Sequence, residues 1–370
     1  MQWIENSFSE YKALLKRFAA IPAPSGDEGR RVAFLTEHIR ELGYESFADE
    51  ANNVYVALGE PPFETCFIAH TDVVFPDTEP LPVCEEGERL LGPGIGDNSA
   101  DVCAMLMMLR FLAEKRIKLS RSALFVFDSC EEGLGNLKGV RAAMKRFEGQ
   151  IESVICFDCS LDEGLITTAV GSERWRVSCE TAGGHSFAAF GSPNAIHRMA
   201  GLVSELYKQT LPEKPGTRTT YNTGVITGGT SINTIAQSCE LLYEYRSDDS
   251  ECLEIMRGQF KRLLSGADCA EARFEAELIG ERPCGKNVSE AALKALYARC
   301  GEAIASVTGG YPAMNAGSTD ANIPLSMGLP AVTFGLFVGG GAHTREEWLE
   351  TASLKTGLEI ALRLLLAGRA

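Results

Sequence analysis

The sequence predicts an α/β protein in which a mostly parallel sheet with helices on both faces is interrupted by a smaller α+β domain. Short apolar runs alternate with helical stretches in the first part of the chain, which is the order that gives parallel sheets. Between about residues 172 and 283 the order changes to β-α-β-β-α-β, which is typical of a ferredoxin-like unit. The first pattern resumes near residue 285, so one domain interrupts the other.

The larger domain is expected to span residues 1–171 and 284–370, with strands at apolar runs and helices where apolar residues recur at helical spacing. Its expected strands cover residues 53–58, 65–69, 123–127, 153–157 and 331–334. Its expected helices cover residues 7–20, 100–115, 137–147, 289–306 and 347–367. One further helix, which Ser25 is expected to cap, should end near Gly43.

The inserted domain is expected to span residues 172–283. Its first strand has apolar residues at Trp175, Val177 and Cys179 with polar residues between them, as a half-buried strand does. The expected strands of this domain cover residues 174–181, 221–227, 238–245 and 271–279. Its two expected helices cover residues 194–209 and 250–265.

Composition narrows the class of protein. With 370 residues the chain is too long for one ordinary core, and its 45% hydrophobic and 23% charged residues are ordinary for a soluble protein. The net charge of −15 argues against nucleic acid or an anionic membrane as a partner. No apolar run approaches a membrane span, and the first residues lack the apolar core of a signal peptide. The 12 scattered cysteines are therefore expected to be reduced thiols of a cytoplasmic protein.

Polar residues with metal-ligand chemistry follow the ends of the expected strands, where open α/β sheets bind ligands. They are His70, Asp72, Asp97, Glu131, Glu132, Asp158 and His343. Two histidines and several carboxylates fit two zinc ions that share a bridging carboxylate. Such a pair of ions polarises a carbonyl and holds an attacking water, while one of the adjacent glutamates can serve as the base.

Each of these residues has an ordinary alternative. His70 and Asp72 could be a hydrogen-bonded pair, Asp97 could be a helix N-cap, and the two glutamates could lie in a solvated turn. Five such groups at separate strand ends or helix starts favour a metal site. Competing patterns are incomplete, since Gly92-x-Gly94-x-Gly96 lacks the spacing of a phosphate loop and no G-x-S-x-G is present.

The order of the motifs resembles a known family. The motifs are Ala69-His-Thr-Asp72, Gly94-Ile-Gly-Asp97-Asn98, Glu131-Glu132-Gly133, Phe157-Asp158 and Ala342-His-Thr344, with Ile21-Pro-Ala-Pro-Ser-Gly-Asp-Glu28 before them. Over essentially the whole chain they resemble the zinc exopeptidases and amidohydrolases that include peptidase T, carnosinase, bacterial glutamate carboxypeptidase and aminoacylase (metallopeptidase family twenty). The resemblance implies a lid or dimerisation role for the inserted domain and a homodimer formed through it.

The resemblance also implies a ligand set for two Zn²⁺ ions, with Co²⁺ or Mn²⁺ as substitutes. His70 and Asp158 would bind one ion, Glu132 and His343 the other, and Asp97 would bridge them. Glu131 would be the general base that activates a bridging water. Asp72 would orient the His70 imidazole, as metal-bound histidines usually require.

The fifth ligand bears on the substrate. An aspartate at position 158 resembles the aminopeptidase and dipeptidase branch, whereas carboxypeptidases and deacylases tend to have glutamate. We therefore expect a tripeptidase- or dipeptidase-like aminopeptidase that hydrolyses short peptides from a free N-terminus. The alternatives are an N-acyl amino acid deacylase or a carboxypeptidase with the same site, and a non-catalytic metal-binding protein.

Further residues are assigned to substrate by the resemblance. His185, in Gly183-Gly184-His185-Ser186, would steady the oxyanion from its own subunit or across a dimer, although alone it reads as a turn residue. Asn233 and Arg246 match positions that bind polar or carboxylate groups of the substrate, while Arg246 could equally be a strand-end charge. Ser318 and Thr319 lie in a segment that resembles a lining of the substrate pocket.

Overall fold

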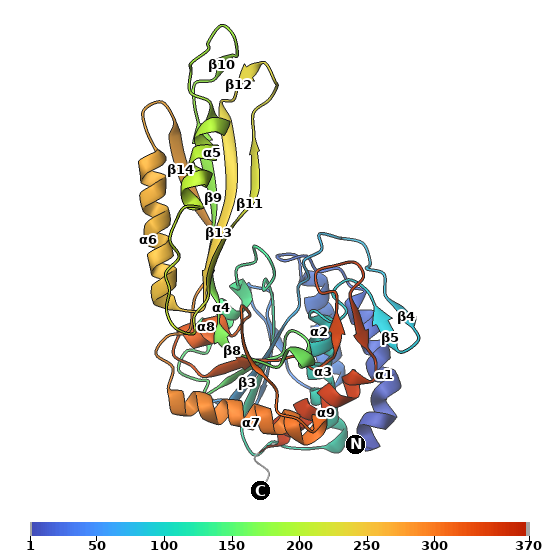
Figure 1. Ribbon diagram of the computed structural model, residues 1–370. Helices are drawn as coiled ribbons and strands as arrows, with labels where there is room; N and C mark the ends of the chain where they lie inside the picture. The colour runs from blue at the N-terminus through green and yellow to red at the C-terminus, as the bar shows by residue number, and fades with distance from the viewer. Residues whose placement is uncertain (1, 368–370) are drawn as a thin grey trace. The chain divides into compact units, whose positions relative to one another are not determined.

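The computed structural model describes residues 2–367 and divides into two compact units. Residues 2–169 and 285–367 form the first unit, and residues 170–284 form the second (Figure 1). The second unit covers the segment for which the sequence predicts an inserted domain. Each unit has its own sheet and its own hydrophobic core.

The first unit is built on an eight-stranded sheet with the order β1-β2-β6-β3-β7-β16-β8-β15. The strands are β1 (Phe47–Ala48), β2 (Val54–Leu58), β3 (Thr65–His70), β6 (Ala123–Asp128), β7 (Val154–Cys156), β8 (Leu165–Ala169), β15 (Met314–Gly317) and β16 (Ala331–Thr333). The central strands β6, β3, β7 and β16 pair in parallel, whereas β2 pairs antiparallel with β6. The predicted mostly parallel sheet is confirmed.

Helices cover both faces of this sheet, as predicted. They are α1 (Gln2–Ala19), α2 (Gly29–Glu41), α3 (Ser99–Lys115), α4 (Lys138–Arg146), α7 (Glu290–Thr308), α8 (Asn322–Ser326) and α9 (Ser353–Leu366). Successive side chains of a strand point to opposite faces, so Phe67 and Ala69 of β3 enter one core cluster while Cys66 and Ile68 enter the other. The first cluster includes residues of α1, α2, α3, α7 and α9, and the second includes residues of α4 and α8.

Two local predictions for this unit are wrong. Ser25 does not cap α2, because the helix begins at Gly29 with Glu28 at the N-cap position, and the Ser25 hydroxyl bonds to Asp72 instead. The last helix, α9, begins at Ser353 and not at residue 347, because residues 348–350 form a strand of a second sheet.

That second sheet of the first unit joins two segments that lie far apart in the sequence. Its strands are β4 (Cys84–Glu86), β5 (Arg89–Leu91), β17 (Gly339–Gly340) and β18 (Trp348–Glu350), in the order β17-β18-β5-β4. The pairing of Trp348 with Leu91 brings the chain after His343 next to the chain before Asp97. The sequence did not predict these strands, since two- and three-residue strands are too short to show an alternating pattern.

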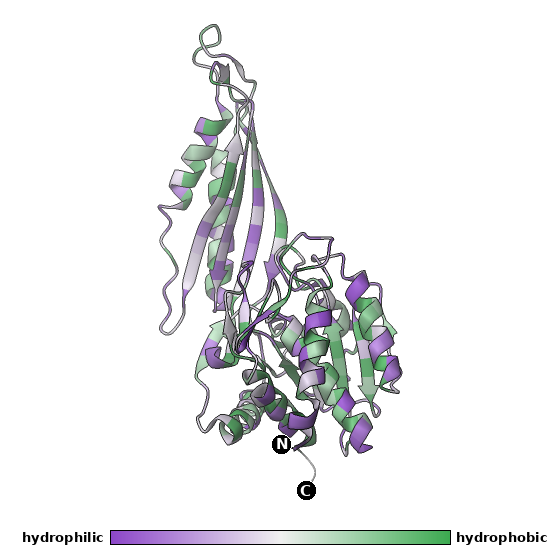
Figure 2. Ribbon diagram, turned by 90° about the vertical axis from the view of Figure 1, so that its right-hand side faces the viewer, coloured by the Kyte–Doolittle hydropathy of each residue, from purple (hydrophilic) through white to green (hydrophobic). Residues whose placement is uncertain are grey.

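The second unit has the predicted β-α-β-β-α-β order, to which two short strands are added that the sequence did not predict. The predicted elements are β9 (Gly171–Glu180), α5 (Ala195–Leu206), β11 (Thr219–Gly228), β13 (Ser238–Ser247), α6 (Ser250–Ala267) and β14 (Arg273–Arg282), and the added strands are β10 (Gly184–His185) and β12 (Thr234–Ile235). The four long strands form an antiparallel sheet in the order β11-β13-β9-β14, and β10 pairs with β12. Hydrophilic and hydrophobic residues alternate along its helices in Figure 2, as expected for helices that cover one face of a sheet.

Two global properties follow from these elements. Among residues 2–367, no helix is both long and apolar enough to cross a membrane. The 12 cysteines all lie in this part of the chain, and none of them is joined to another.

Candidate metal centre

The site begins where β3 ends. His70 is the last residue of this strand and is 1% exposed, and in register it lies beside Asp128, the last residue of β6. Thr71 then fixes the turn, because its backbone N–H and its hydroxyl both donate to the carbonyl of Asp128, at 2.8 and 2.7 Å. The end of β3 is therefore held to its neighbour at the point where the imidazole leaves the sheet.

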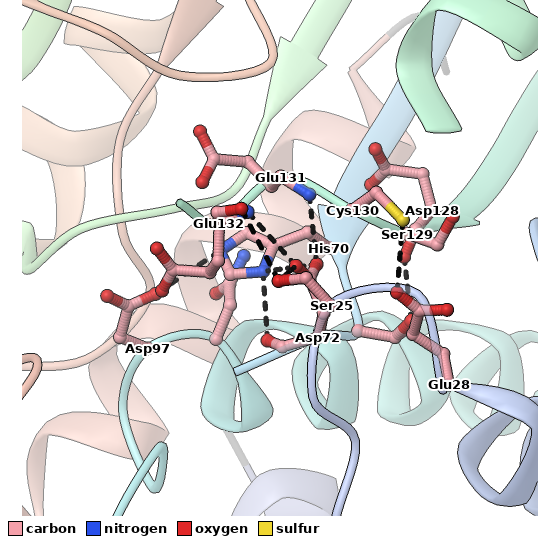
Figure 3. A network of polar contacts seen from close by, with 12 residues as sticks. Ser25, Glu28, His70, Asp72, Asp97, Asp128, Ser129, Cys130, Glu131 and Glu132 are labelled. Carbon is pink, nitrogen blue, oxygen red and sulfur yellow. Dashed lines mark hydrogen bonds and ion pairs between the residues drawn. The ribbon is translucent and has the colours of Figure 1, made fainter. Parts of the chain in front are cut away.

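The carboxylate of Asp72 is occupied by donors from three parts of the chain (Figure 3). It accepts the backbone N–H groups of Glu131 and Glu132, each at 3.0 Å, and the Ser25 hydroxyl at 2.6 Å. The Nδ1 atom of His70 lies 3.4 Å from Asp72 Oδ1 and 3.2 Å from the Asp72 carbonyl oxygen. Because both neighbours are acceptors, Nδ1 carries a proton, so Nε2 is the nitrogen that would bind a metal ion after losing its own proton.

The other ring nitrogen of His70 points toward two carboxylates. His70 Nε2 lies 3.2 Å from Asp97 Oδ1 and 3.9 Å from Asp158 Oδ1. One ligand atom from each of these three residues lies within 4.8 Å of the others, so they form a set that could hold a metal ion. Asp97 comes from the loop before α3, and Asp158 from the end of β7.

A second set shares Asp97 with the first. His343 Nε2 lies 3.2 Å from Asp97 Oδ2 and 3.2 Å from Glu132 Oε1, and these three residues also fall within 4.8 Å of one another. The two oxygens of Asp97 therefore serve different sets, Oδ1 beside His70 and Oδ2 beside His343. This is the geometry of a carboxylate that bridges two cations. Asp97 is not a helix cap, since Asn98 holds the N-cap position of α3.

Glu131 adds a further carboxylate to the same place. It is 5% exposed, and one of its oxygens lies within 4.8 Å of ligand atoms of His70 and Glu132. Asp72 binds the backbone N–H groups of both glutamates, so it fixes the backbone of this pair relative to His70. The adjacent glutamates therefore lie in a buried turn and not in a solvated one.

The backbone of the site takes conformations that side chains rarely adopt. Cys130, Cys159 and His343 have φ angles of 58°, 70° and 64°, in the left-handed region. Cys130 precedes Glu131 and Cys159 follows Asp158, so all three positions belong to the site or adjoin it. Such conformations persist where the surrounding structure holds them, and they cluster at functional sites.

The charges of the site are not balanced by protein groups. Burial, together with the neighbouring Asp97, raises the pKa of Glu132 to about 7. Burial and the repulsion of nearby carboxylates raise the pKa of Asp158 well above its usual value. The hydrogen bonds to Asp97 and Glu132 raise the pKa of His343 to about 11. Divalent cations would supply the missing positive charge, and imidazole nitrogens with carboxylate oxygens are ligands that zinc accepts, so the residues fit a pair of metal ions.

Burial alone would lower the pKa of His70, but its hydrogen bonds to Asp72 and Asp97 raise that pKa well above the usual value. Burial would likewise raise the pKa of Asp97, but the hydrogen bonds from His343 and His70 lower it well below the ordinary range. Asp97 therefore stays ionised at neutral pH.

The sequence did not predict a role for three buried acidic residues around the site. Asp128 and Asp320 are buried carboxyl groups near the site, and burial raises the pKa of Asp128 to about 8. Asp128 ends a strand just as His70 does, so the same rule could have included it. Glu347, 2% exposed, binds the loop that carries Asp97. No pattern in the neighbouring residues marks Glu347, because the loop that it binds lies far away in the sequence.

The residues that were predicted to contact substrate lie in both units. In the second unit, His185 is exposed on β10 and accepts from the N–H of Phe187 at 3.2 Å, and Asn233 lies beside it, since the Ser186 N–H donates to the Asn233 carbonyl. Arg246 on β13 is bound at 3.1 Å through two nitrogens by Glu244 of the same strand.

In the first unit, Ser318 is half-buried and Thr319 is buried. The Thr319 hydroxyl shares a hydrogen bond of 2.8 Å with Thr333, and the Thr319 N–H donates to Asn322. Substrate contacts by Ser318, Thr319, His185, Asn233 and Arg246 stay predictions.

Comparison with known proteins identifies the family. Residues 66–367 match the model of peptidase family M20/M25/M40. The chain belongs to this family. The predicted resemblance is thereby confirmed, and the chain is a hydrolase of the metallopeptidase class.

Members and neighbours differ in their described activities. The succinyl-diaminopimelate desuccinylase of Methylorubrum populi is 24% identical over 92% of this chain and 94% of its own. Aminopeptidase PepT from Bacillus cereus has a TM-score of 0.76 at 19% identity, covering 97% of this chain and 98% of its own. A tripeptidase from Staphylococcus aureus has a TM-score of 0.77 at 22% identity, with 97% of both chains covered. The YXEP protein of Bacillus subtilis, described as a dinuclear metal binding peptidase, has a TM-score of 0.65 at 14% identity, with 98% of both chains covered.

Proposed function

We propose that the protein is a di-zinc aminopeptidase that hydrolyses short peptides from a free N-terminus, as tripeptidases and dipeptidases do. The observation that carries this proposal is that the two oxygens of the Asp97 carboxylate face different histidines. Its Oδ1 lies 3.2 Å from His70 Nε2, and its Oδ2 lies 3.2 Å from His343 Nε2. A single carboxylate shared by two sets of ligands is suited to two adjacent cations.

The proposed ligands are those of the two sets. His70 and Asp158 would hold one Zn²⁺, Glu132 and His343 would hold the other, and Asp97 would be shared by both, with Co²⁺ or Mn²⁺ as substitutes. When bound, the ions polarise the scissile carbonyl and make water a stronger acid. In this proposal Glu131 accepts the proton of the attacking water and delivers it to the leaving amine. Asp72 keeps His70 in the tautomer that presents Nε2 to the ion.

The specificity for a free N-terminus rests on Asp158. The residue at this position is an aspartate, as in the aminopeptidase branch, and two solved structures of this fold are an aminopeptidase and a tripeptidase. A second candidate is an N-acyl amino acid deacylase, and the similarity to desuccinylases over 92% of the chain favours it. A carboxypeptidase that uses the same site is a further alternative. A non-catalytic role is disfavoured because every predicted ligand and Glu131 are present.

We further propose a cytoplasmic homodimer joined through the inserted unit, in which His185 steadies the oxyanion while Asn233 and Arg246 bind polar groups of the peptide. Ser318 and Thr319 are proposed to line the substrate pocket. The support for a dimer is β11, an edge strand of its sheet whose Val225 and Ile226 side chains are 45% and 48% exposed. An exposed edge strand of this length is a template for pairing with a second chain.

One experiment separates the candidates. The metal-depleted enzyme is reloaded with Zn²⁺, and hydrolysis is measured on one set of di- and tripeptides with free, acetylated or succinylated N-termini. Cleavage of the free peptides at the first bond supports the aminopeptidase. Preference for the acylated peptides, with release of the acyl group, supports the deacylase and overturns the first proposal. Absence of hydrolysis after reloading with Zn²⁺, Co²⁺ or Mn²⁺ overturns both.

A further inference from the structure

We infer that Glu347 is a positioning residue of the metal centre, which holds the loop of the bridging Asp97 at a fixed place relative to His343. This inference rests on the proposed function. The carboxylate of Glu347 accepts three backbone N–H groups of that loop. Its Oε2 binds the N–H of Gly94 at 2.7 Å, and its Oε1 binds the N–H groups of Gly96 at 2.8 Å and of Asp97 at 2.7 Å.

The backbone of Glu347 joins the same loop. Its carbonyl oxygen accepts the N–H of Gly92 at 2.9 Å, so one residue satisfies four N–H groups between positions 92 and 97. At 2% exposure, the carboxylate has little water to replace these partners. Buried backbone N–H groups are costly to leave without an acceptor. The loop therefore depends on Glu347 for its shape.

The glycines of the loop leave the room that this arrangement requires. A Cβ atom at Gly96 would lie 2.6 Å from the ring of Phe337 and 3.0 Å from Glu347 Oε1. At Gly94 the φ angle is +68°, and a Cβ atom would lie 2.5 Å from Val73 Cγ1. Gly96 is thus explained by the close approach of Phe337 and of the Glu347 carboxylate, and Gly94 by its left-handed φ angle and the neighbouring Val73, without binding of a phosphate group.

Glu347 links two ligands that the chain order separates. His343 lies four residues before Glu347, on the segment that connects β17 to β18. Asp97 follows β5, which pairs with β18 through Leu91 and Trp348. Both Asp97 and His343 belong to the set that includes Glu132. The carboxylate of Glu347 therefore sets the spacing between two ligands of one proposed ion.

Groups that orient metal ligands are worth about 10–100-fold in metal affinity or activity. Glu347→Gln is the sharpest variant, because it keeps the volume of the side chain. One of the two oxygens becomes an NH₂ group, which cannot accept the N–H that faces it. Glu346→Gln is the matched control, since this neighbour is exposed and makes the same change of charge.

The test uses the full-length protein freed of metal. Each variant is titrated with Co²⁺, and the number of ions and their affinities are measured by calorimetry and by visible absorption. We expect two ions in the wild type and in Glu346→Gln. In Glu347→Gln we expect two ions as well, but one of them should bind about 10–100-fold more weakly than in the wild type. The kcat should be lower and the KM nearly unchanged. Glu347→Asp, which keeps the charge but is shorter, should lie between them.

The results separate positioning from a purely structural role. A structural role lowers the unfolding temperature of the metal-free variant but leaves Co²⁺ affinity and kcat of the folded protein unchanged, and that result overturns the inference. If Glu347→Gln does not fold, the same comparison is made with Glu347→Asp, for which wild-type Co²⁺ affinity and kcat overturn the inference equally. If the wild type itself binds no Co²⁺ or Zn²⁺, the proposed function fails first and the inference falls with it.

Discussion

Asp97 Oδ2 lies 3.2 Å from His343 Nε2, although the two residues belong to the first and the last third of the chain. The other oxygen of Asp97 lies at the same distance from His70 Nε2. This relationship defines what the site can hold, since each histidine meets the same carboxylate from a different side.

Replacement of Asp97 by Asn should remove one of the two anionic oxygens while leaving the size of the side chain unchanged. Because the two oxygens face different ligand sets, we expect the variant to bind one ion in place of two. Turnover should fall by more than about 100-fold, which is the upper end of the loss expected when a residue that only orients a metal ligand is removed. Metal content by mass spectrometry under native conditions checks this. Asp27→Asn, at an exposed position, is the control. Two tightly bound ions in Asp97→Asn would show that Asp97 is not a bridge.

Glu131→Gln should keep the metal ions and lose activity, because the proposed role of Glu131 is proton transfer. General-base catalysis is worth about 10²–10⁴-fold, so kcat should fall by that factor. The measurement is kcat together with metal content, and Glu148→Gln at an exposed position is the control. Unchanged hydrolysis by Glu131→Gln would show that Glu131 is not the general base.

Asp72→Asn should weaken both the fold and the metal centre. The amide can no longer accept both backbone N–H groups of Glu131 and Glu132, and a buried donor without an acceptor costs about 1–3 kcal/mol. Metal affinity should fall about 10–100-fold, because His70 loses its orienting partner. Ser25→Ala, which removes one donor to the same carboxylate, should cost about 1 kcal/mol. Denaturant unfolding and metal titration measure the two effects, and equal effects of both variants would contradict the role of Asp72.

Metal affinity should rise with pH. In the metal-free protein the pKa of His343 is raised to about 11 and that of Glu132 to about 7. At pH 7 His343 is therefore protonated and Glu132 is partly so, and a cation must displace these protons. Lowering the pH makes the displacement harder, so binding should weaken from pH 8 to pH 6 and should release protons. Titrations in buffers of different ionisation enthalpy count the protons. Affinity independent of pH, with no proton released, would refute this account.

Ile226→Asp should convert the proposed dimer to a monomer, because it places a charge on the exposed edge strand β11. Light scattering measures the mass in solution. Leu278→Asp lies on β14, at the opposite edge of the same sheet, and is 41% exposed in the wild type, so it is a matched control. A monomeric wild type would exclude the proposed interface. A dimer that survives Ile226→Asp would exclude it as well.

The sequence predicted what depends on local pattern. β3 and β6 are short apolar runs that end in polar residues, and their parallel pairing follows from the helices between strands. The strand-end rule thereby brings His70, Glu132 and Asp158 together from the sequence alone. Asp97 and His343 lie in loops, where the pattern of strands is a weaker guide, and the motifs that contain them assigned their roles as ligands.

Other features depend on contacts between distant segments and have no local signal. Glu347 binds Gly94 across 253 positions of the chain, and nothing in the residues around either one indicates the other. For the same reason α9 was predicted to begin too early, because residues 348–350 pair with β5 and do not continue the helix. Ser25 has the side chain of a helix cap, yet the buried Asp72 carboxylate is its acceptor.

The small sheet that pairs β18 with β5 has a consequence for biosynthesis. The ligand set of Asp97, Glu132 and His343 takes its members from residues 97 to 343, and β17 and β18 lie near the end of the chain. During translation this set therefore cannot form until residue 343 has left the ribosome, whereas His70, Asp97 and Asp158 are available earlier. Emergence of the segment that carries His343 and β18 is then the step that completes the second ligand set.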